Sequence, residues 1–285
     1  MHGRPLNFDM QIMENRLTRQ AQMEIIAPLL RDDIRAAGDN IPSLLDGLYA
    51  NIPDNKRISY GRVHTIKELA NYLHNQLLEK KAPGISIASK MVAGATERRT
   101  IGVALCLLSL YAKEAYPKVI AHFEMAAMSA DWEVREFSQM FFRKIIQHHP
   151  ERIQPYLLKT AQSREPNLRR FVAETLRPCV ETKWIYKQPA YSMLVLRHLF
   201  YEKAAYPRTA VGNNLSDLAR RLPELVYDVI AELVGSGDKN AYWIAYRACR
   251  NLVKKEPKRV MDLLKIDEYR YKKRVYYRPS ASSSK

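Results

Sequence analysis

The chain has 285 residues, of which 47% are hydrophobic and 27% charged, so a globular protein with a sizeable core is expected rather than a disordered one. Only 10 residues are glycine, a scarcity that argues against hairpin-rich folds and phosphate-binding loops and favours helices joined by short turns. The formal charge of +16 and the pI near 9.7 indicate a polyanionic partner such as nucleic acid.

The N-terminal part divides into two regions by composition. Residues 1–40 are polar, and we expect this segment to be only partly ordered; it lacks the apolar core of a signal peptide. Residues 57–80 and 98–113 have helical patterns, and the apolar run 101–111 within the second is too short to span a bilayer. These features predict a cytoplasmic protein with no membrane partner.

A helix opener recurs from residue 116 onward. Each copy places a proline at the first helical position, where its fixed φ suits a helix and its missing N–H is not needed. Apolar residues follow at spacings of three and four. The five prolines are Pro117, Pro150, Pro189, Pro223 and Pro257, so the intervals are 33, 39, 34 and 34 residues.

A second predicted helix precedes each of the last four openers, at 132–147, 167–178, 207–221 and 241–255. Two helices in roughly every 34 residues are the signature of a helical solenoid, whose repeats bury their apolar faces only by stacking. TPR repeats share this length, but their small-residue and aromatic pattern is missing. We therefore predict an all-α fold, a HEAT-like helical-repeat solenoid (an α-α superhelix) over residues 41–268 with a concave basic face.

Arginine recurs at the same early point of three of these helices, as Arg135, Arg169 and Arg208. Stacked repeats would align the three into a basic stripe, which suits a phosphate backbone. In the helix 167–178, Arg170 and Glu174 share a face, and Arg177 follows three residues later. The alternative is a ladder of exposed ion pairs, each contributing only about 0.2–0.5 kcal/mol.

Further candidates lie at the ends of these helices. Trp132 and Glu136 share one helix face, and Asp131 precedes them. The alternative for Trp132 is a core aromatic, and the alternative for Glu136 is a solvated surface charge. The alternative for Asp131 is an N-cap.

Polar and basic residues of the later repeats are also candidate phosphate contacts. Asn213 and Asn214 lie near the start of a helix, where they serve either a turn or a phosphate. Lys254 and Lys255 end the predicted helix 241–255 and add two more cations.

The long interval of 39 residues reflects an insertion at 177–189 that contains Trp184 and Tyr186. Insertions in solenoids map to loops on one face, often the binding face, although packing of Trp184 beneath the loop is the alternative. The basic and aromatic tail 269–285 holds four tyrosines, a mixture that suits base stacking and phosphate contact. Its last six residues are better explained as a solubilising end.

Metal and cofactor sites are not expected. The three cysteines are far apart and form no Cys/His cluster, which excludes a disulfide framework or a structural zinc. The sequence also contains no P-loop, GxSxG elbow or HExxH motif.

The C-terminal half resembles the AlkC/AlkD superfamily of bacterial DNA alkylation-repair proteins, which are built from HEAT-like repeats. The segment 168–178, LRRFVAETLRP, is similar to the VRRxxxExxRP segment of AlkC-type members, and Trp184 lies beyond it. Residues 208–226 and 243–264 are similar to the later repeats of that group. The resemblance covers roughly 130–265 and is faint before it.

The resemblance implies a DNA glycosylase that grips duplex DNA in a concave basic groove and excises N3- or N7-alkylated purines. It also implies a bacterial protein that is associated with the nucleoid when it is bound to DNA. Glu174 matches the family's carboxylate, and Trp184 matches the tryptophan after the Arg-Pro pair. In the preceding repeat, Asp131 fits the AlkC-like register, whereas Trp132 with Glu136 fits the AlkD-like spacing.

The chain also departs from the family pattern. Two extra residues separate Glu174 from Trp184, and Asn213 stands where AlkD-like enzymes place a tryptophan. Superfamily members such as AlkF and AlkG bind branched DNA without excising bases. Three hypotheses follow: an alkylpurine glycosylase, a non-catalytic binder of branched or damaged DNA, and a protein–protein scaffold.

Overall fold

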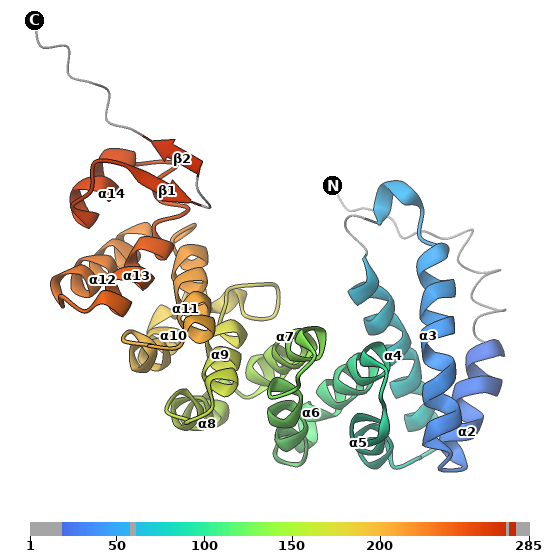
Figure 1. Ribbon diagram of the computed structural model, residues 1–285. Coiled ribbons are helices and arrows are strands. Elements are labelled where there is room, and N and C mark those ends of the chain that lie inside the picture. Colours follow the sequence, from blue (N-terminus) through green and yellow to red (C-terminus); the bar gives the residue numbers. More distant parts are fainter. Residues whose placement is uncertain (1–18, 58–60, 272–273, 278–285) are drawn as a thin grey trace, which may run out of the picture. The chain divides into compact units, whose positions relative to one another are not determined.

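The computed structural model describes residues 19–57, 61–271 and 274–277 (Figure 1). The chain divides into two compact units, residues 1–145 and 146–285, which are described separately. The helices of the first unit are η1 (Gln22–Ile26), α2 (Ala27–Leu30), α3 (Ile34–Ala50), η2 (Asp54–Lys56), α4 (Arg62–Glu79), α5 (Gly84–Gly94), α6 (Arg98–Ala127) and α7 (Trp132–His148), whose end extends into the second unit.

The first unit is a bundle in which α6 packs against α4 and α5, and η1 packs against α3. Ile25, Ile26 and Leu29 are buried, so the part of 1–40 that the structure describes is folded into this unit. The domain start that we expected at residue 41 lies inside α3. The run 101–111 lies within α6, which continues past a break at Ala115 (φ −135°, ψ 30°) to include the Pro117 opener.

The second unit stacks helices in two layers (Figure 1). Helices α9, α11 and α13 pack in succession, and α8, α10, α12 and α14 form the other layer. Its elements are α8 (Pro150–Ala161), α9 (Pro166–Thr175), η3 (Lys183–Tyr186), α10 (Pro189–Leu196), η4 (Arg197–Leu199), α11 (Ala205–Leu218), α12 (Pro223–Gly235), α13 (Lys239–Ala248), α14 (Pro257–Leu264), β1 (Tyr269–Tyr271) and β2 (Arg274–Tyr277). The predicted all-α, HEAT-like solenoid is confirmed.

The proline openers begin α8, α10, α12 and α14, as predicted. The residue before each proline has φ between −127° and −136° and ψ between 53° and 65°. Proline disfavours the helical region for the residue that precedes it, so the same local rule starts α8, α10, α12 and α14.

Polar contacts tie neighbouring repeats together at the period found in the sequence. The partners lie 32 to 35 residues apart in Arg169–Glu202, Arg208–Asn240, Arg247–Asn213, Arg197–Glu232, Arg259–Glu224 and Asn251–Ser216. The repeat is therefore visible both in the helices and in the side-chain contacts between them.

The start of the predicted tail is folded. Strands β1 and β2 form an antiparallel hairpin, with Tyr269 opposite Tyr277. The Tyr269 side chain is buried, its ring stacks on Tyr246 with centroids 4.5 Å apart, and its hydroxyl donates to the Tyr246 carbonyl at 2.8 Å. Residues 272–273 and 278–285 of that tail lie outside the described residues.

Two further observations concern the described part of the chain alone. None of its helices combines the length and the apolar composition that a bilayer span requires. Within the same residues, no three His, Cys, Asp or Glu side chains are grouped as ligands of a metal ion.

Candidate nucleic-acid interface

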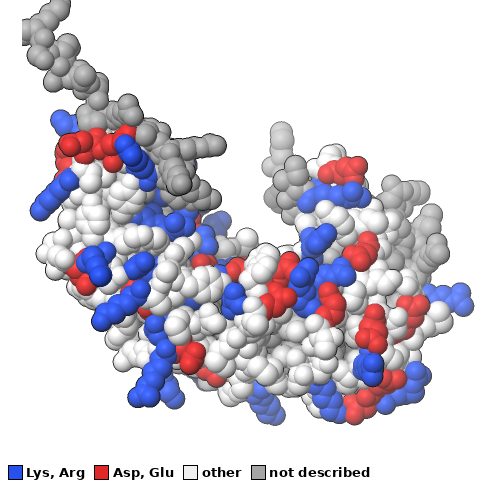
Figure 2. All heavy atoms as spheres, in the orientation of Figure 1, with Lys and Arg blue, Asp and Glu red and all other residues white. Residues whose placement is uncertain are grey.

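The positive charge is concentrated in the second unit. Residues 146–285 contain 27 Lys and Arg against 14 Asp and Glu, a net charge of +13, whereas residues 1–145 contain 19 against 16. On the face drawn in Figure 2, basic side chains lie with acidic ones between them rather than in a single patch. The place where a polyanion can bind therefore depends on which arginines form ion pairs with Asp or Glu side chains.

Glu174 belongs to a partly buried cluster at the ends of α9 and α11. Its carboxylate accepts from Arg177 Nη1 at 2.9 Å, and Arg177 also donates from Nε and Nη2 to Asp217 Oδ2 at 2.8 and 2.6 Å. Glu174 is 5% exposed and Asp217 8%. The pKa of Arg177 is raised, because its two carboxylates outweigh the desolvation that opposes its charge. This cluster unites two predicted site residues and adds Asp217, which the sequence analysis missed.

Arg170 and Arg169 are adjacent in sequence but have different surroundings. Arg170 is buried, and its guanidinium lies over the Tyr206 ring, 4.3 Å from the centroid. Arg169 forms a two-bond ion pair with Glu202, at 2.6 and 3.0 Å. It also donates to the carbonyls of Ser163 and Arg164, at 2.8 and 3.0 Å.

The Arg169–Glu202 pair is electrostatically favourable to both groups. The hydrogen bond to Glu202 raises the pKa of Arg169. Burial acts to raise the pKa of Glu202, but the bonds from Arg169 and from the Ala204 amide lower it below its usual range. The structure thus gives Arg169 an internal partner, and its predicted contact with phosphate stays a prediction.

Arg135 repeats the local arrangement of Arg169. Its Nη1 donates to the carbonyls of Ser129 and Ala130, six and five residues earlier, at 2.6 and 2.8 Å. The early arginine therefore binds the loop that leads into its own helix in both repeats. This role for the recurrent position was not anticipated from the sequence.

The other candidates at the start of α7 differ in exposure. Asp131 Oδ1 accepts from the Glu133 amide at 2.8 Å, which is the N-cap role given as its alternative. Trp132 is 61% exposed, so it is not a core aromatic. Glu136 accepts a hydrogen bond from Gln139.

Arg208 and Asn213 contact residues of α13. Arg208 donates to Asn240 Oδ1 at 2.5 Å, and its guanidinium lies 4.9 Å from the Trp243 ring centroid. Asn213 Oδ1 accepts from Arg247 and Arg250. These partners in α13 and in the turn that follows it were not predicted, although a separation near one repeat length could have identified them.

Asn214 has a structural role. It is fully buried between helices, and its amide donates to the Ala173 carbonyl of α9 at 2.8 Å. This contact stabilises the packing of α11 against α9, and the burial removes Asn214 from the surface that a phosphate could reach.

The tryptophan of the inserted segment 177–189 is half-buried. The Trp184 ring packs edge-on against Tyr191, with centroids 4.9 Å apart, and its Nε1 is buried without a hydrogen-bond partner. Tyr191 in turn donates to the Pro150 carbonyl at 2.7 Å. Trp184 therefore contacts the α8–α10 side, while Tyr186 reaches the Asp217 carbonyl of α11 at 3.3 Å.

Lys254 and Lys255 are exposed, as a phosphate contact requires, but they are not helical. α13 ends at Ala248, so the helix predicted to reach residue 255 is shorter than expected. The lysines instead lie in the turn that leads to Pro257.

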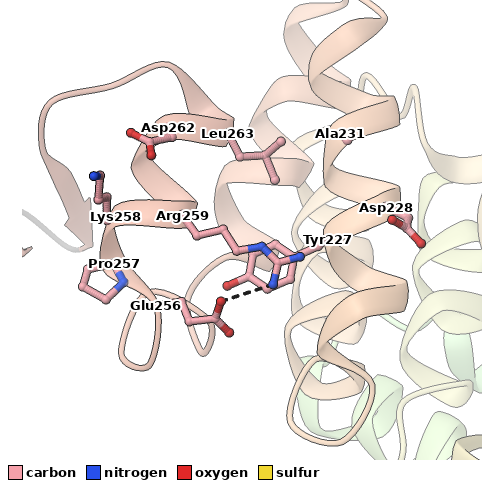
Figure 3. Close-up of a pocket in the computed structure, with 9 residues that line it drawn as sticks. All are labelled: Tyr227, Asp228, Ala231, Glu256, Pro257, Lys258, Arg259, Asp262 and Leu263. Atoms are coloured by element: carbon pink, nitrogen blue, oxygen red, sulfur yellow. Dashed lines mark hydrogen bonds and ion pairs between the residues drawn. The ribbon is translucent and has the colours of Figure 1, made fainter.

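A groove of about 810 Å³ lies between α12 and α14, away from the α9–α11–α13 layer (Figure 3). Arg259 crosses it with its guanidinium 3.7 Å from the Tyr227 ring centroid and bonded to Glu256. Because Arg259 also pairs with Glu224, its charge is used within the protein. We do not assign the groove to the interface.

The fold and these clusters define a helical-repeat protein with a basic C-terminal unit. No family model matches the sequence, and no curated protein matches it either. AlkD2 from Streptococcus mutans is similar in structure, with a TM-score of 0.54 and 16% identity over 75% of this chain and 98% of its own. The structure of smu.31 from Streptococcus mutans UA159 has a TM-score of 0.50 and 17% identity, covering 65% of this chain and 98% of that one.

The third similar structure is a complex with DNA. It is the alkylpurine DNA glycosylase AlkC of Pseudomonas fluorescens bound to DNA containing an abasic site analog, with a TM-score of 0.52 and 18% identity. The match covers 80% of this chain and 65% of AlkC. At these identities the likeness shows a shared fold, and it confirms the architecture that the sequence segments predicted.

Proposed function

We propose that this protein binds duplex DNA and takes part in the repair of alkylated DNA. The observation that carries the proposal is the combination of an AlkC/AlkD-like solenoid with a net charge of +13 on residues 146–285. Such a charge attracts a polyanion through counterion release and does not require that the protein read a sequence. In this proposal, the phosphates are contacted by cations on the α9–α11–α13 layer and by Lys254 and Lys255, which are exposed.

Within this function, we propose that Glu174 supports excision of N3- or N7-alkylated purines. A cationic alkylpurine is already a good leaving group, so the enzyme mainly has to stabilise the positive charge that develops on the sugar and to position a water. Arg177 fixes the Glu174 carboxylate, and Asp217 fixes Arg177. Asp217 also pairs with Arg220 at 3.4 Å, so the Glu174 carboxylate belongs to a preorganised network of ion pairs that needs neither a metal nor a cofactor.

Non-catalytic binding of branched or damaged DNA is the second candidate. The low exposure of Glu174, 5%, favours it, because excision requires the carboxylate to reach the sugar or the attacking water. A protein–protein scaffold is the third candidate, and it predicts no DNA affinity.

Two measurements separate the three candidates. DNA binding predicts that log K falls with log salt concentration with a slope of about −0.9 for each phosphate contacted. A salt-independent or absent affinity for a methylated duplex would instead support the scaffold and contradict the proposal.

An assay for the release of methylated base from duplex DNA then distinguishes a glycosylase from a non-catalytic DNA binder. We expect Glu174→Gln to lower the excision rate by roughly 100-fold or more while duplex affinity is retained. Glu232→Gln is the matched control, because Glu232 is an exposed acid of α12 that pairs with Arg197. No base released by the wild-type protein, or equal rates in wild type and Glu174→Gln, would remove the catalytic role and leave the binder.

A further inference from the structure

A cation stands two residues before the proline that opens each of α10, α12 and α14. The three residues are Lys187, Arg221 and Lys255, which we call the turn cations, and they follow one another at intervals of 34 residues. All three are exposed. Their position repeats with the period of the solenoid, but it differs from that of the early arginines, because it comes after α9, α11 and α13 rather than near their starts.

Contacts between neighbouring repeats bring the turns that carry these cations side by side. The Arg221 guanidinium lies 5.1 Å from the centroid of the Tyr186 ring, so the turn before α12 touches the segment before α10. Asn251 Nδ2 donates to the Ser216 carbonyl at 2.8 Å, so the turn before α14 touches the end of α11, which leads into the turn before α12. The three turns therefore form one edge of the second unit.

The charge of the turn cations is not used by carboxylates nearby. Within the described part of the chain, none of the three lies within ion-pair distance of an Asp or Glu side chain. The two acids next to these turns, Glu224 and Glu256, both pair with Arg259. The Tyr186 ring attracts the Arg221 guanidinium without removing its charge. All three positive charges are therefore available to a ligand in solvent.

The spacing of the turns suits the backbone of a nucleic acid. Packed helices lie about 8–10 Å apart, and successive phosphates of one DNA strand are about 3.4 Å apart along the duplex axis. Cations on successive repeats therefore correspond to about every third phosphate of a strand. A small anion would meet only one of these cations, so the ligand that uses all three is an extended polyanion.

The same edge of the unit holds the Glu174 carboxylate. Arg177 bridges Glu174 to Asp217, and the backbone carbonyl of Asp217 accepts from the Tyr186 hydroxyl at 3.3 Å. The early arginine Arg208 lies near the other end of α11, a helix of 14 residues that is about 21 Å long. The candidate carboxylate is thus on the side of the turn cations rather than on the side of the early arginines.

We propose that the turn cations form a row that binds the phosphate backbone of one DNA strand and places that strand beside Glu174. The inference rests on the proposed function insofar as the polyanion is DNA. Phosphate contacts fix the register and orientation of a duplex and carry no sequence information. The row therefore sets where the strand lies, and it acts equally on all base sequences.

Removing the three charges together tests the row. The triple variant Lys187→Gln, Arg221→Gln, Lys255→Gln should lower duplex affinity roughly 10-fold or more, equally for different base sequences. Each lost phosphate contact should reduce the salt slope by about 0.9, so the slope should fall by about 2.7 in all. A slope equal to that of the wild type would overturn the row.

The opposite turns of the same repeats provide the matched control. Lys159, Lys203 and Lys239 are exposed and lie near the turns that join α8 to α9, η4 to α11 and α12 to α13. Changing these three to Gln removes the same charge from the same unit and should leave the salt slope nearly unchanged. Equal losses in the two triple variants would overturn the row while leaving DNA binding by the protein intact.

A double variant separates the loss of charge from an effect on folding. Lys187→Gln with Lys255→Gln keeps the contact of Arg221 with Tyr186 and should still reduce the salt slope by about 1.8. Urea denaturation of all variants checks that they are folded under the conditions of the binding assay. A double variant that is folded and binds like the wild type would contradict the row.

A separate arm covers a wild-type protein that binds no duplex DNA, which would refute the proposed function. Inorganic polyphosphate is then titrated into the wild type and the two triple variants while tryptophan fluorescence is recorded. Binding that the triple variant of the turn cations loses and the control variant keeps supports the row by itself. No binding by the wild type, or equal losses in both variants, overturns it.

Discussion

The ion pair between Arg169 and Glu202 offers a direct test of what the recurrent early arginine does. The two side chains are 18% and 5% exposed and are joined by two N–H···O bonds. Removing one partner of a buried pair costs about 3–5 kcal/mol, whereas an exposed pair contributes about 0–1 kcal/mol. Because the arginine is partly solvated, we expect Arg169→Met to cost about 2–3 kcal/mol.

A double-mutant cycle isolates the pairwise contribution. Arg169→Met, Glu202→Gln and the double variant are compared by urea denaturation followed through tryptophan fluorescence, with Trp184 and Trp243 reporting on the second unit. The expected coupling is about 1.5–3 kcal/mol, as for hydrogen bonds to charged groups. A coupling below about 0.5 kcal/mol would refute the structural role, because it is typical of an exposed pair.

DNA affinity completes this test. If Arg169 is occupied by Glu202, Arg169→Met should leave the salt slope of duplex binding unchanged under conditions where the variant is folded. A slope lower by about 0.9 would restore Arg169 to the phosphate-binding residues that the sequence predicted.

Two further predictions concern stability. The pKa of Glu202 is lowered in the folded protein, so its contribution to the free energy of unfolding should be complete above about pH 5. That contribution should be lost as the pH falls through the ordinary glutamate pKa of about 4.3 toward the lower pKa of the folded protein. In urea titrations the stability difference between wild type and Glu202→Gln should therefore shrink on acidification, and a constant difference would contradict this. In the first unit, Gly84→Ala should destabilise by about 1–3 kcal/mol, because its Cβ would lie 1.9 Å from the Tyr111 hydroxyl. Gly94→Ala, where no atom lies within 4 Å, is the control and should be neutral or stabilising by up to about 1 kcal/mol; equal effects of the two changes would show that the Tyr111 contact does not constrain the helix.

Much of the fold could be predicted because it depends on local rules. A proline at the first helical position and apolar residues at spacings of three and four recur at Pro150, Pro189, Pro223 and Pro257, and each marks a helix in the structure. The end of α13 was placed too late, since basic and apolar residues continue to Lys255 through a turn that periodicity alone does not distinguish from a helix.

The partners of the charged residues could not be predicted in the same way. Three arginines that look alike in sequence have different partners. Arg169 pairs with Glu202, Arg177 with Glu174 and Asp217, and Arg208 with the amide of Asn240. Trp184 illustrates the same limit, because only the packing against Tyr191 shows that it lies beneath the inserted segment.

The sequence by itself determined the repeat, the helix starts and the excess of positive charge, because these follow from backbone preferences and composition. Only the tertiary structure decided which side chains the arginines Arg169, Arg177 and Arg208 contact, because those partners lie about one repeat away and meet only when α9, α11 and α13 stack.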